Sequence, residues 1–275
     1  MTERTKIHRV QAGLFPVNAY IVETSDAAIV VDATLGVSDA RAIAAQVRAT
    51  GRPLAGVIVT HTHPDHYGGV TALVEGASIP IYSVAGVSDV IRRDDDAKEQ
   101  ILRPMFGDEW ATQRTFPNRI VNDGERVSIA DAAFRVVDVG PGESPHDSWW
   151  ILEGDGPLTA FVGDLVYSHM HSYLADGYHE SWLRNIARAR RELPEDVRLM
   201  MGHGEPGVGH RLLEWQAEYI NRVLEAIRTA VDRDGLDGEA LADAVTTRMR
   251  GFLPTEDLLF LTRLSVAPLR RQIPS

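Results

Sequence analysis

The sequence predicts a single α+β domain, and three observations lead to this prediction. Short apolar runs rich in β-branched residues are interspersed with longer amphipathic runs, which indicates strands and helices in one fold. The chain has 275 residues, of which 44% are hydrophobic, and a chain of this size can bury one large core. No linker is long enough or biased enough to divide residues 1–275 into independent domains.

The first elements form the edge of a sheet followed by a helix. Residues 20–22 and 29–31 are apolar runs typical of the strands of a meander. Residues 38–50 have a helical pattern, with Ser38 as the expected N-cap and Gly51 just beyond the end.

The most informative segment is residues 61–66, which read His-Thr-His-Pro-Asp-His. It follows an apolar run at residues 57–60 and precedes Gly68, Gly69 and a helical run at residues 70–75, so it is predicted to be a loop between a strand and a helix. Three imidazoles and a carboxylate this close would compete for the same protons unless a cation held them. The segment therefore predicts a metal site.

The spacing within this loop indicates two adjacent metal ions. His61 and His63 are two residues apart, and in extended backbone such side chains point the same way, so both can bind one ion. Pro64 then turns the chain. We therefore expect Asp65 and His66 to face a second ion.

Three later apolar runs, each predicted to be a strand, end close to a further candidate ligand. The runs are residues 134–139, 159–162 and 198–201. The ligands that follow them are His146, Asp164 and His203.

This order of ligands resembles the signature of the metallo-β-lactamase superfamily, which is His-x-His-x-Asp-His followed by a His, an Asp and a His at strand ends. The resemblance covers residues 7–230. It implies a four-layer αββα sandwich, with two mixed sheets face to face between outer helices and the metals at one edge. It also implies a first metal held by His61, His63 and His146, a second held by Asp65, His66 and His203, and Asp164 as the bridge. Asp32, at the end of an early strand, resembles the family's Asp that supports the metal loop, or is a turn-forming Asp.

The third ligand is the point where the sequence departs from the family. The family usually has Pro-Gly-His-Thr, whereas residues 141–144 are Pro-Gly-Glu-Ser, and a strict register places Glu143 at the ligand position. We expect His146 instead, because it lies four residues before Trp150 in the next strand. If Glu143 were the ligand, its carboxylate would favour harder ions such as iron or manganese.

The composition limits the ligands and the partners. With no cysteine, the ligands must be nitrogen and oxygen, so we expect two Zn²⁺ ions, and iron or manganese also suits this set. The charge of −11 argues against nucleic acid as a partner. No apolar run approaches membrane-spanning length, and residues 1–10 do not read as a secretory signal, so a cytoplasmic enzyme with no membrane contact is expected.

The expected chemistry is hydrolysis of a carboxylic ester, lactone or thioester of a small molecule. Two cations about 4 Å apart lower the pKa of a bridging water to about 7, which supplies hydroxide as the nucleophile. We expect Asp65 to orient this water and move its proton. Tyr167 matches the Tyr that lactone-cleaving relatives carry three residues after the bridging Asp, and could donate to an oxyanion. His171 is a candidate proton donor or an ordinary surface histidine.

Other functions use the same residues. A glyoxalase-type thioesterase or a β-lactam hydrolase would act on another acyl compound by the same chemistry. An iron-dependent oxygenase or oxidoreductase of this fold would use nearly the same ligands, and a non-catalytic binding protein is the third class.

Two segments are additions to the sandwich. Residues 88–118 are a charged helical insertion near the cleft, in which Met105, Phe106 and Trp110 either line the cleft or pin a surface helix. Residues 236–275 are a helical C-terminal extension that either caps the core or contributes to a homodimer contact.

Overall fold

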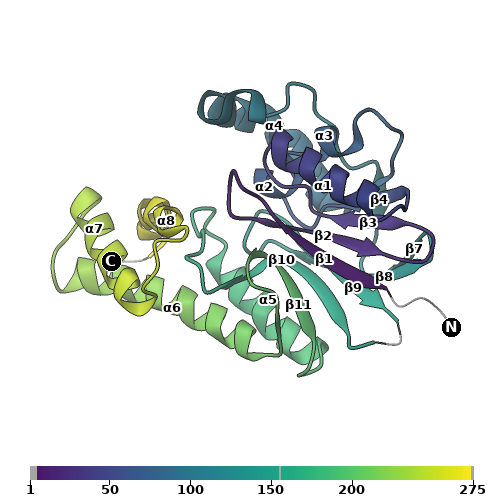
Figure 1. Cartoon of the computed structure of the whole chain (residues 1–275). Coiled ribbons are helices and arrows are strands. Elements are labelled where there is room, and N and C mark those ends of the chain that lie inside the picture. Colours follow the sequence, from purple (N-terminus) through teal and green to yellow (C-terminus); the bar gives the residue numbers. More distant parts are fainter. Residues whose placement is uncertain (1–4, 155, 274–275) are drawn as a thin grey trace.

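The computed structural model describes residues 5–154 and 156–273 and has two mixed sheets packed face to face between outer helices (Figure 1). Six strands form each sheet. The predicted α+β sandwich is therefore confirmed. Among the residues that the structure describes, no helix combines the length and apolarity needed to cross a lipid bilayer.

The first sheet is built from the N-terminal half of the chain. Its strands, in spatial order, are β1 (Lys6–Gln11), β2 (Asn18–Glu23), β3 (Ala28–Val31), β4 (Leu54–Ile58), β5 (Ile81–Val84) and β6 (Arg119–Val121). The pairs from β1 to β3 are antiparallel and those from β3 to β6 are parallel. The parallel strands bring their carboxyl ends to one edge, where the loop after β4 lies.

Helices α1 (Val37–Ala49), α3 (Val70–Val74) and α4 (Ala85–Phe106) cover the outer face of this sheet (Figure 1). The helix predicted at residues 38–50 is α1, but the expected N-cap is wrong. Gly36 is the N-cap, and the Ser38 hydroxyl instead donates a hydrogen bond to Glu109 at 2.9 Å.

The second sheet is built from the C-terminal half. Its strands, in spatial order, are β12 (Gly207–Val208), β11 (Arg198–Gly204), β10 (Thr159–Ser168), β9 (Asp147–Glu153), β8 (Ala132–Gly140) and β7 (Arg126–Ile129). Strands β10 and β11 run parallel and pair as far as Ser168 opposite Gly204, with Tyr167 opposite His203. Both strands are longer than the sequence predicted, so Asp164 and His203 lie inside strands rather than after them.

Two clusters of buried apolar side chains hold the layers together. One covers both faces of the first sheet: it joins this sheet to the second one, through side chains such as Ile29, Phe134 and Phe161, and extends under α1, α3 and α4. The other lies on the opposite face of the second sheet, under α5 (His179–Glu192) and α6 (Arg211–Asp232). Burial of this apolar surface is the main stabilising contribution to the fold.

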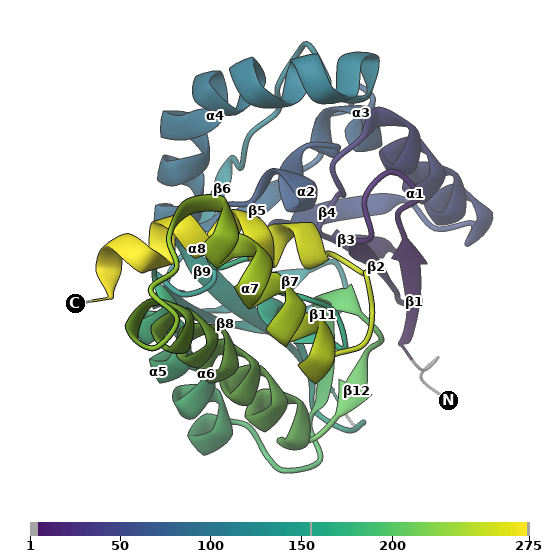
Figure 2. The same cartoon turned by 90° about the vertical axis from the view of Figure 1, so that its left-hand side faces the viewer.

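The C-terminal extension forms α7 (Gly238–Phe252) and α8 (Leu259–Gln272), which pack on α6 (Figure 2). Leu258, Val266 and Leu269 are buried in the second cluster. The extension therefore caps this core.

The insertion at residues 88–118 corresponds to the longer part of α4, a short 3₁₀ turn and the chain that leads to β6. Trp110 is fully buried, and the guanidinium of Arg114 lies over its ring at 3.8 Å. Met105 is 67% exposed. Trp110 thus pins the insertion to the sandwich and does not line a cleft.

Candidate metal centre

The centre lies where the loop between β4 and α2 (Pro64–Tyr67) meets strand ends of the second sheet. The backbone carbonyl of Thr60 accepts hydrogen bonds from the Ser148 amide at 2.9 Å and from its hydroxyl at 2.7 Å. His61 forms an isolated bridge with Asp147. These contacts join the two sheets beside the His-rich loop.

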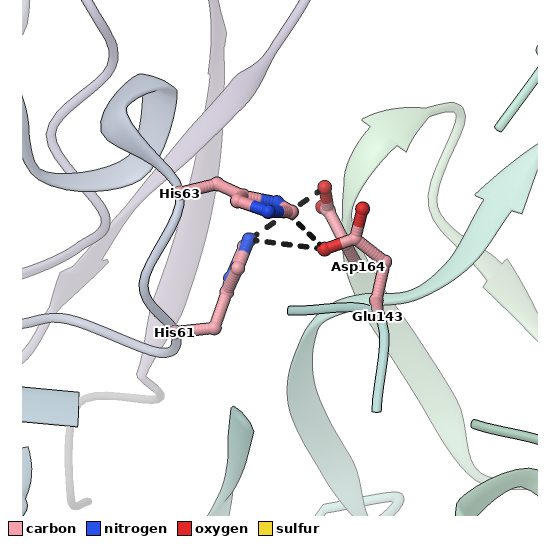
Figure 3. Close-up of side chains that lie close together, drawn as sticks. All are labelled: His61, His63, Glu143 and Asp164. Atoms are coloured by element: carbon pink, nitrogen blue, oxygen red, sulfur yellow. Dashed lines mark ion pairs between the residues drawn. The ribbon is translucent and has the colours of Figure 1, made fainter. Parts of the chain in front are cut away.

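The first metal position is defined by His61, His63, Glu143 and Asp164 (Figure 3). His61 Nε2 lies 3.7 Å from Glu143 Oε2 and 3.7 Å from Asp164 Oδ2. His63 Nδ1 lies 2.7 Å from Glu143 Oε2. All four residues are buried.

The second metal position is defined by Asp65, His66 and His203, together with Asp164. His203 Nε2 lies 3.2 Å from both Asp65 Oδ2 and Asp164 Oδ2. His66 Nε2 lies 3.4 Å from Asp164 Oδ1 and 3.7 Å from Asp65 Oδ2. Because Asp164 contacts side chains of both positions, it has the geometry of a bridge.

The spacing of these atoms fits metal coordination. Ligand atoms bound to one tetrahedral ion at about 2.1 Å lie about 3.4 Å apart. Most of the distances between the candidate ligand atoms are 3.2–3.7 Å. Gly202 is required beside them, since a Cβ there would lie 2.0 Å from Asp164 Oδ1 and 2.4 Å from His66 Cε1.

The nitrogen of each imidazole that faces away from the centre is held by a partner, which fixes the ring and its tautomer. The pairs are His61 Nδ1 with Thr60 Oγ1 at 3.0 Å, His63 Nε2 with Asp176 at 2.9 Å, His66 Nδ1 with Asp32 at 2.8 Å and His203 Nδ1 with the Pro16 carbonyl at 2.6 Å. The opposite nitrogen of each ring is the one that faces the carboxylates.

Four atoms of the centre are buried and, among the described residues, lack a hydrogen bond of acceptable geometry: His61 Nε2, His66 Nε2, Glu143 Oε2 and Asp164 Oδ1. Burying such atoms without a partner is costly. Their convergence is what a cation site requires, so the side chains fit the implied metals.

The pKa shifts of the side chains at the centre also indicate a metal site. Burial lowers the pKa of His61 well below its usual value, and burial raises the pKa of Glu143 to about 8. Burial also lowers the pKa of His203, but the carboxylates of Asp164 and Asp65 together outweigh it and the pKa rises to about 10. Cations between these groups would let the carboxylates stay charged and the imidazoles stay neutral.

The expectation that His146 joins His61 and His63 is wrong in this structure, since Glu143 takes that place. His146 Nε2 lies 2.7 Å from Asp138 Oδ1, and its ring packs so closely over Gly86 at the start of α4 that a Cβ there would lie 2.1 Å away. Asp147 accounts for the difference. Its carboxylate accepts hydrogen bonds from the Glu143 amide at 2.6 Å and the Ser144 amide at 3.1 Å, which curls the loop and turns Glu143 inward.

Tyr167 lies at the centre, but its hydroxyl faces ligands and not open space. The oxygen is 2.8 Å from Asp164 Oδ2 and 2.9 Å from Glu143 Oε1, and the ring stacks on His203 at 4.6 Å. Burial and these carboxylates raise the pKa of Tyr167 well above its usual value, so the hydroxyl remains a donor. It orients the carboxylates, which differs from the oxyanion contact expected from the sequence.

His171 does not reach the centre, and the expectation that it acts there is wrong in this structure. Its Nδ1 lies 2.7 Å from the Tyr219 hydroxyl, and its Nε2 lies 3.2 Å from the Thr255 carbonyl oxygen. The side chain is fully buried against α6 and the chain before α8. His171 therefore connects its loop to the C-terminal extension.

Sequence reasoning missed two residues that support the centre, Asp147 and Asp176. Neither lies in a recognisable motif. A strict register of the Pro-Gly-x-x loop would have indicated Glu143, but no local pattern marks Asp176. Asp32, by contrast, lies where the family resemblance placed it, with its carboxylate on His66 and Thr60.

Comparisons with known proteins show the family to which the fold belongs. The model of the metallo-beta-lactamase superfamily matches residues 12–203. A hydroxyacylglutathione hydrolase from Alkalilimnicola ehrlichii is 29% identical over 235 residues, covering 71% of this chain and 78% of that protein. Another, from Albidiferax ferrireducens, is 23% identical over 240 residues, covering 87% of this chain and 78% of that protein.

Two solved structures share the fold over nearly the whole chain. A beta-lactamase domain protein from Burkholderia ambifaria has a TM-score of 0.72 at 20% identity, covering 96% of this chain and 85% of its own. A metallo-beta-lactamase family protein from Thermus thermophilus has a TM-score of 0.69 at 21% identity, covering 97% of this chain and 92% of its own. Because the family match spans well over half of the sequence, this chain belongs to the metallo-β-lactamase superfamily.

Proposed function

We propose that the chain is a dinuclear metal-dependent hydrolase that cleaves a carboxylic ester, lactone or thioester of a small molecule. The observation that carries this proposal is the convergence of candidate ligands from four segments of the chain, three of which bring buried atoms without a hydrogen-bond partner. Seven side chains would hold the two cations: His61, His63, Glu143, Asp164, Asp65, His66 and His203.

A pair of bound cations would acidify a water molecule and polarise a carbonyl oxygen. Among the seven ligands, Asp65 is the residue best placed to handle the proton, because its side chain is 15% exposed and the others are at most 9% exposed. Burial raises the pKa of Asp65, but His66 and His203 outweigh it and hold the pKa below its usual value. The carboxylate therefore stays charged and can accept a proton at neutral pH.

The remaining residues keep the ligands in place. Tyr167 donates to the carboxylates of Asp164 or Glu143, and the anchored nitrogens fix the four imidazoles. This arrangement is set before substrate binds, so little reorganisation is needed during the reaction.

The relatives support a thioester among the acyl substrates, because the hydroxyacylglutathione hydrolases are thioester hydrolases. Phe15 lies beside His203, with its ring centroid 5.9 Å from that of His203 and 6.3 Å from that of Phe260 of α8. Phe260 is 52% exposed. These two rings offer an apolar surface for the acyl part of a substrate.

The test is a panel of lactones, thioesters, aryl esters and β-lactams assayed with protein loaded separately with zinc, manganese and iron. We expect turnover of at least one ester, lactone or thioester, and its loss on treatment with a chelator. Protein that retains no metal, or that cleaves none of these compounds in any metal form, would refute the proposal.

A second candidate function rests on one observation: His61, His63 and Glu143 lie together at the first metal position, where the fourth side chain, Asp164, is shared with the second position. Two histidines and one carboxylate form the facial triad of non-haem iron oxygenases. Iron-loaded protein that consumes oxygen with a thiol or thioester substrate, and shows no metal-dependent hydrolysis, would favour this function over the first.

A further inference from the structure

We propose that Asp176 is a positioning residue for the metal ligand His63, and that the C-terminal extension holds Asp176 in place. The proposal rests on the proposed function, because it concerns a ligand of the first metal position. Asp176 lies in the β10–α5 loop (residues 169–178), which supplies none of the seven ligands.

The contact between Asp176 and His63 determines which imidazole nitrogen faces the centre. His63 Nε2 lies 2.9 Å from Asp176 Oδ2, and His63 Nδ1 lies 2.7 Å from Glu143 Oε2. When Nε2–H donates to the carboxylate, the lone pair of the neutral ring is on Nδ1, which points at the first metal position. Without Asp176, nothing else among the described hydrogen bonds holds Nε2.

Tyr173 completes the support on this side. Its hydroxyl donates to Asp176 Oδ1 at 3.3 Å, and the edge of its ring meets the His63 ring at a centroid distance of 5.2 Å and an angle of 84°. The β10–α5 loop therefore fixes the orientation of His63 through one hydrogen bond and one ring contact.

The C-terminal extension in turn fixes this loop. The Leu174 amide donates to Ser265 Oγ at 2.8 Å, and the Thr262 hydroxyl donates to the Ser172 carbonyl at 3.3 Å. The His171 amide donates to the Asp257 carbonyl at 3.1 Å. Three backbone groups of the loop are thus held by the extension.

The residues of α8 that make these bonds are polar and fully buried. Thr262 and Ser265 are 0% exposed, on the face of the helix where Val266 and Leu269 pack into the core. A hydroxyl in such a place is unfavourable unless it is hydrogen-bonded, and its bond specifies one register of helix against loop. The extension therefore places the β10–α5 loop accurately and does more than cover the core.

The first experiment measures metal affinity by competition with a chelator for wild type, Asp176→Ala and Asp176→Asn. We expect Asp176→Ala to weaken one of the two metal equivalents by about 10–100-fold and leave the other unchanged. Asp176→Asn should lose less metal affinity, because its amide oxygen still accepts a hydrogen bond from His63 Nε2–H. Asp243→Ala, which removes an exposed carboxylate paired with Arg263, is the matched control and should bind both equivalents normally.

A second readout is the visible spectrum of the cobalt-loaded proteins, which reports the coordination at each position. We expect the bands of one equivalent to change in Asp176→Ala and not in Asp243→Ala. Unchanged affinity and an unchanged spectrum for both equivalents in Asp176→Ala would overturn the role of Asp176. Failure of wild type to bind metal would instead overturn the proposed function, so the two failures are distinguishable.

The role of the extension is tested with Thr262→Val combined with Ser265→Ala, which keeps the shape of α8. The double variant removes both hydroxyl bonds to the loop, along with the bonds of these hydroxyls to Tyr219 and Leu261. We expect the same equivalent to weaken, by a smaller factor than in Asp176→Ala. The control is Thr246→Val on α7, whose hydroxyl bonds only within its own helix. If the double variant is folded by circular dichroism and binds both equivalents as wild type does, the extension does not position Asp176.

Discussion

The two halves of the sandwich contribute to the metal centre in different ways. The N-terminal half supplies four candidate ligands from one loop of six residues, between β4 and the end of α2. The C-terminal half supplies three, and each comes from a different place: the loop between β8 and β9, strand β10 and strand β11.

This difference determines how substitutions in each half affect the metal centre. In the N-terminal loop local spacing determines which side chains face the centre, and a carboxylate from outside the loop then holds the outer nitrogen of His63 and of His66. In the C-terminal half each ligand depends on the hydrogen bonds of its own segment, such as those from Asp147 to the loop that carries Glu143. The centre should therefore be more sensitive to supporting residues in the C-terminal half.

The largest effect is expected from the N-terminal loop, at Asp65. Asp65→Ala should lower kcat/KM for the best substrate of the panel by at least about 100-fold, because a ligand and the proposed proton acceptor are both lost. Steady-state kinetics of Asp65→Ala beside Asp26→Ala, an exposed turn residue, measures this effect. Near-normal rates in Asp65→Ala would contradict the role assigned to it.

The next prediction compares Glu143 and His146 as the third ligand of the first metal position. Glu143→Gln should reduce the metal content from two equivalents per chain to about one, because a neutral amide is a poor ligand. His146→Gln should keep both equivalents. Elemental analysis after gel filtration decides between them, and loss of metal in His146→Gln alone would restore the interpretation based on the sequence.

A third prediction concerns the support of the N-terminal loop by Asp32. Asp32→Ala leaves the Thr60 amide, the Thr60 hydroxyl and His66 Nδ1 without their buried acceptor. The expected loss is about 2 to 4 kcal/mol in the free energy of unfolding, measured by urea denaturation. Asp32→Asn keeps an acceptor and should lose less of the free energy of unfolding. Equal losses in the two variants would argue against a supporting role for these hydrogen bonds.

The smallest effect is expected for His146, as a dependence of stability on pH. The hydrogen bond to Asp138 raises the pKa of His146 above its unfolded value, although burial opposes it. The stabilisation is therefore complete below the unfolded pKa of about 6.5 and is lost as pH rises through the raised folded pKa. The gap in Tm between wild type and His146→Gln should be larger at pH 6 than at pH 9, and should correspond to at most about 1 kcal/mol. A gap that widens toward pH 9 would contradict this.

The sequence predicted the sandwich and the clustering of the N-terminal candidate ligands because both depend on local order. Apolar strands show themselves by composition, and the His-rich loop places its ligands by spacing of two residues in extended chain. Asp164 and His203 lie inside strands and not after them, but the structure brings both to the cluster, as the order of candidate ligands indicated.

The wrong predictions concern side chains whose direction depends on contacts between segments that are distant in the sequence. Counting back from Trp150 favoured His146, but Asp147 curls the loop and turns Glu143 inward instead. The sequence does not indicate which of the polar side chains after Asp164 point toward the centre. The C-terminal extension draws His171 away from the centre, while the same loop brings Asp176 to His63.

The most direct test of the central claim is an anomalous-difference map from crystals of zinc-loaded protein, with data collected on both sides of the zinc absorption edge. Two peaks are expected, one among His61, His63, Glu143 and Asp164 and the other among Asp65, His66, His203 and Asp164. A map with no peak at either position, or with a peak held by His146 in place of Glu143, would contradict the account.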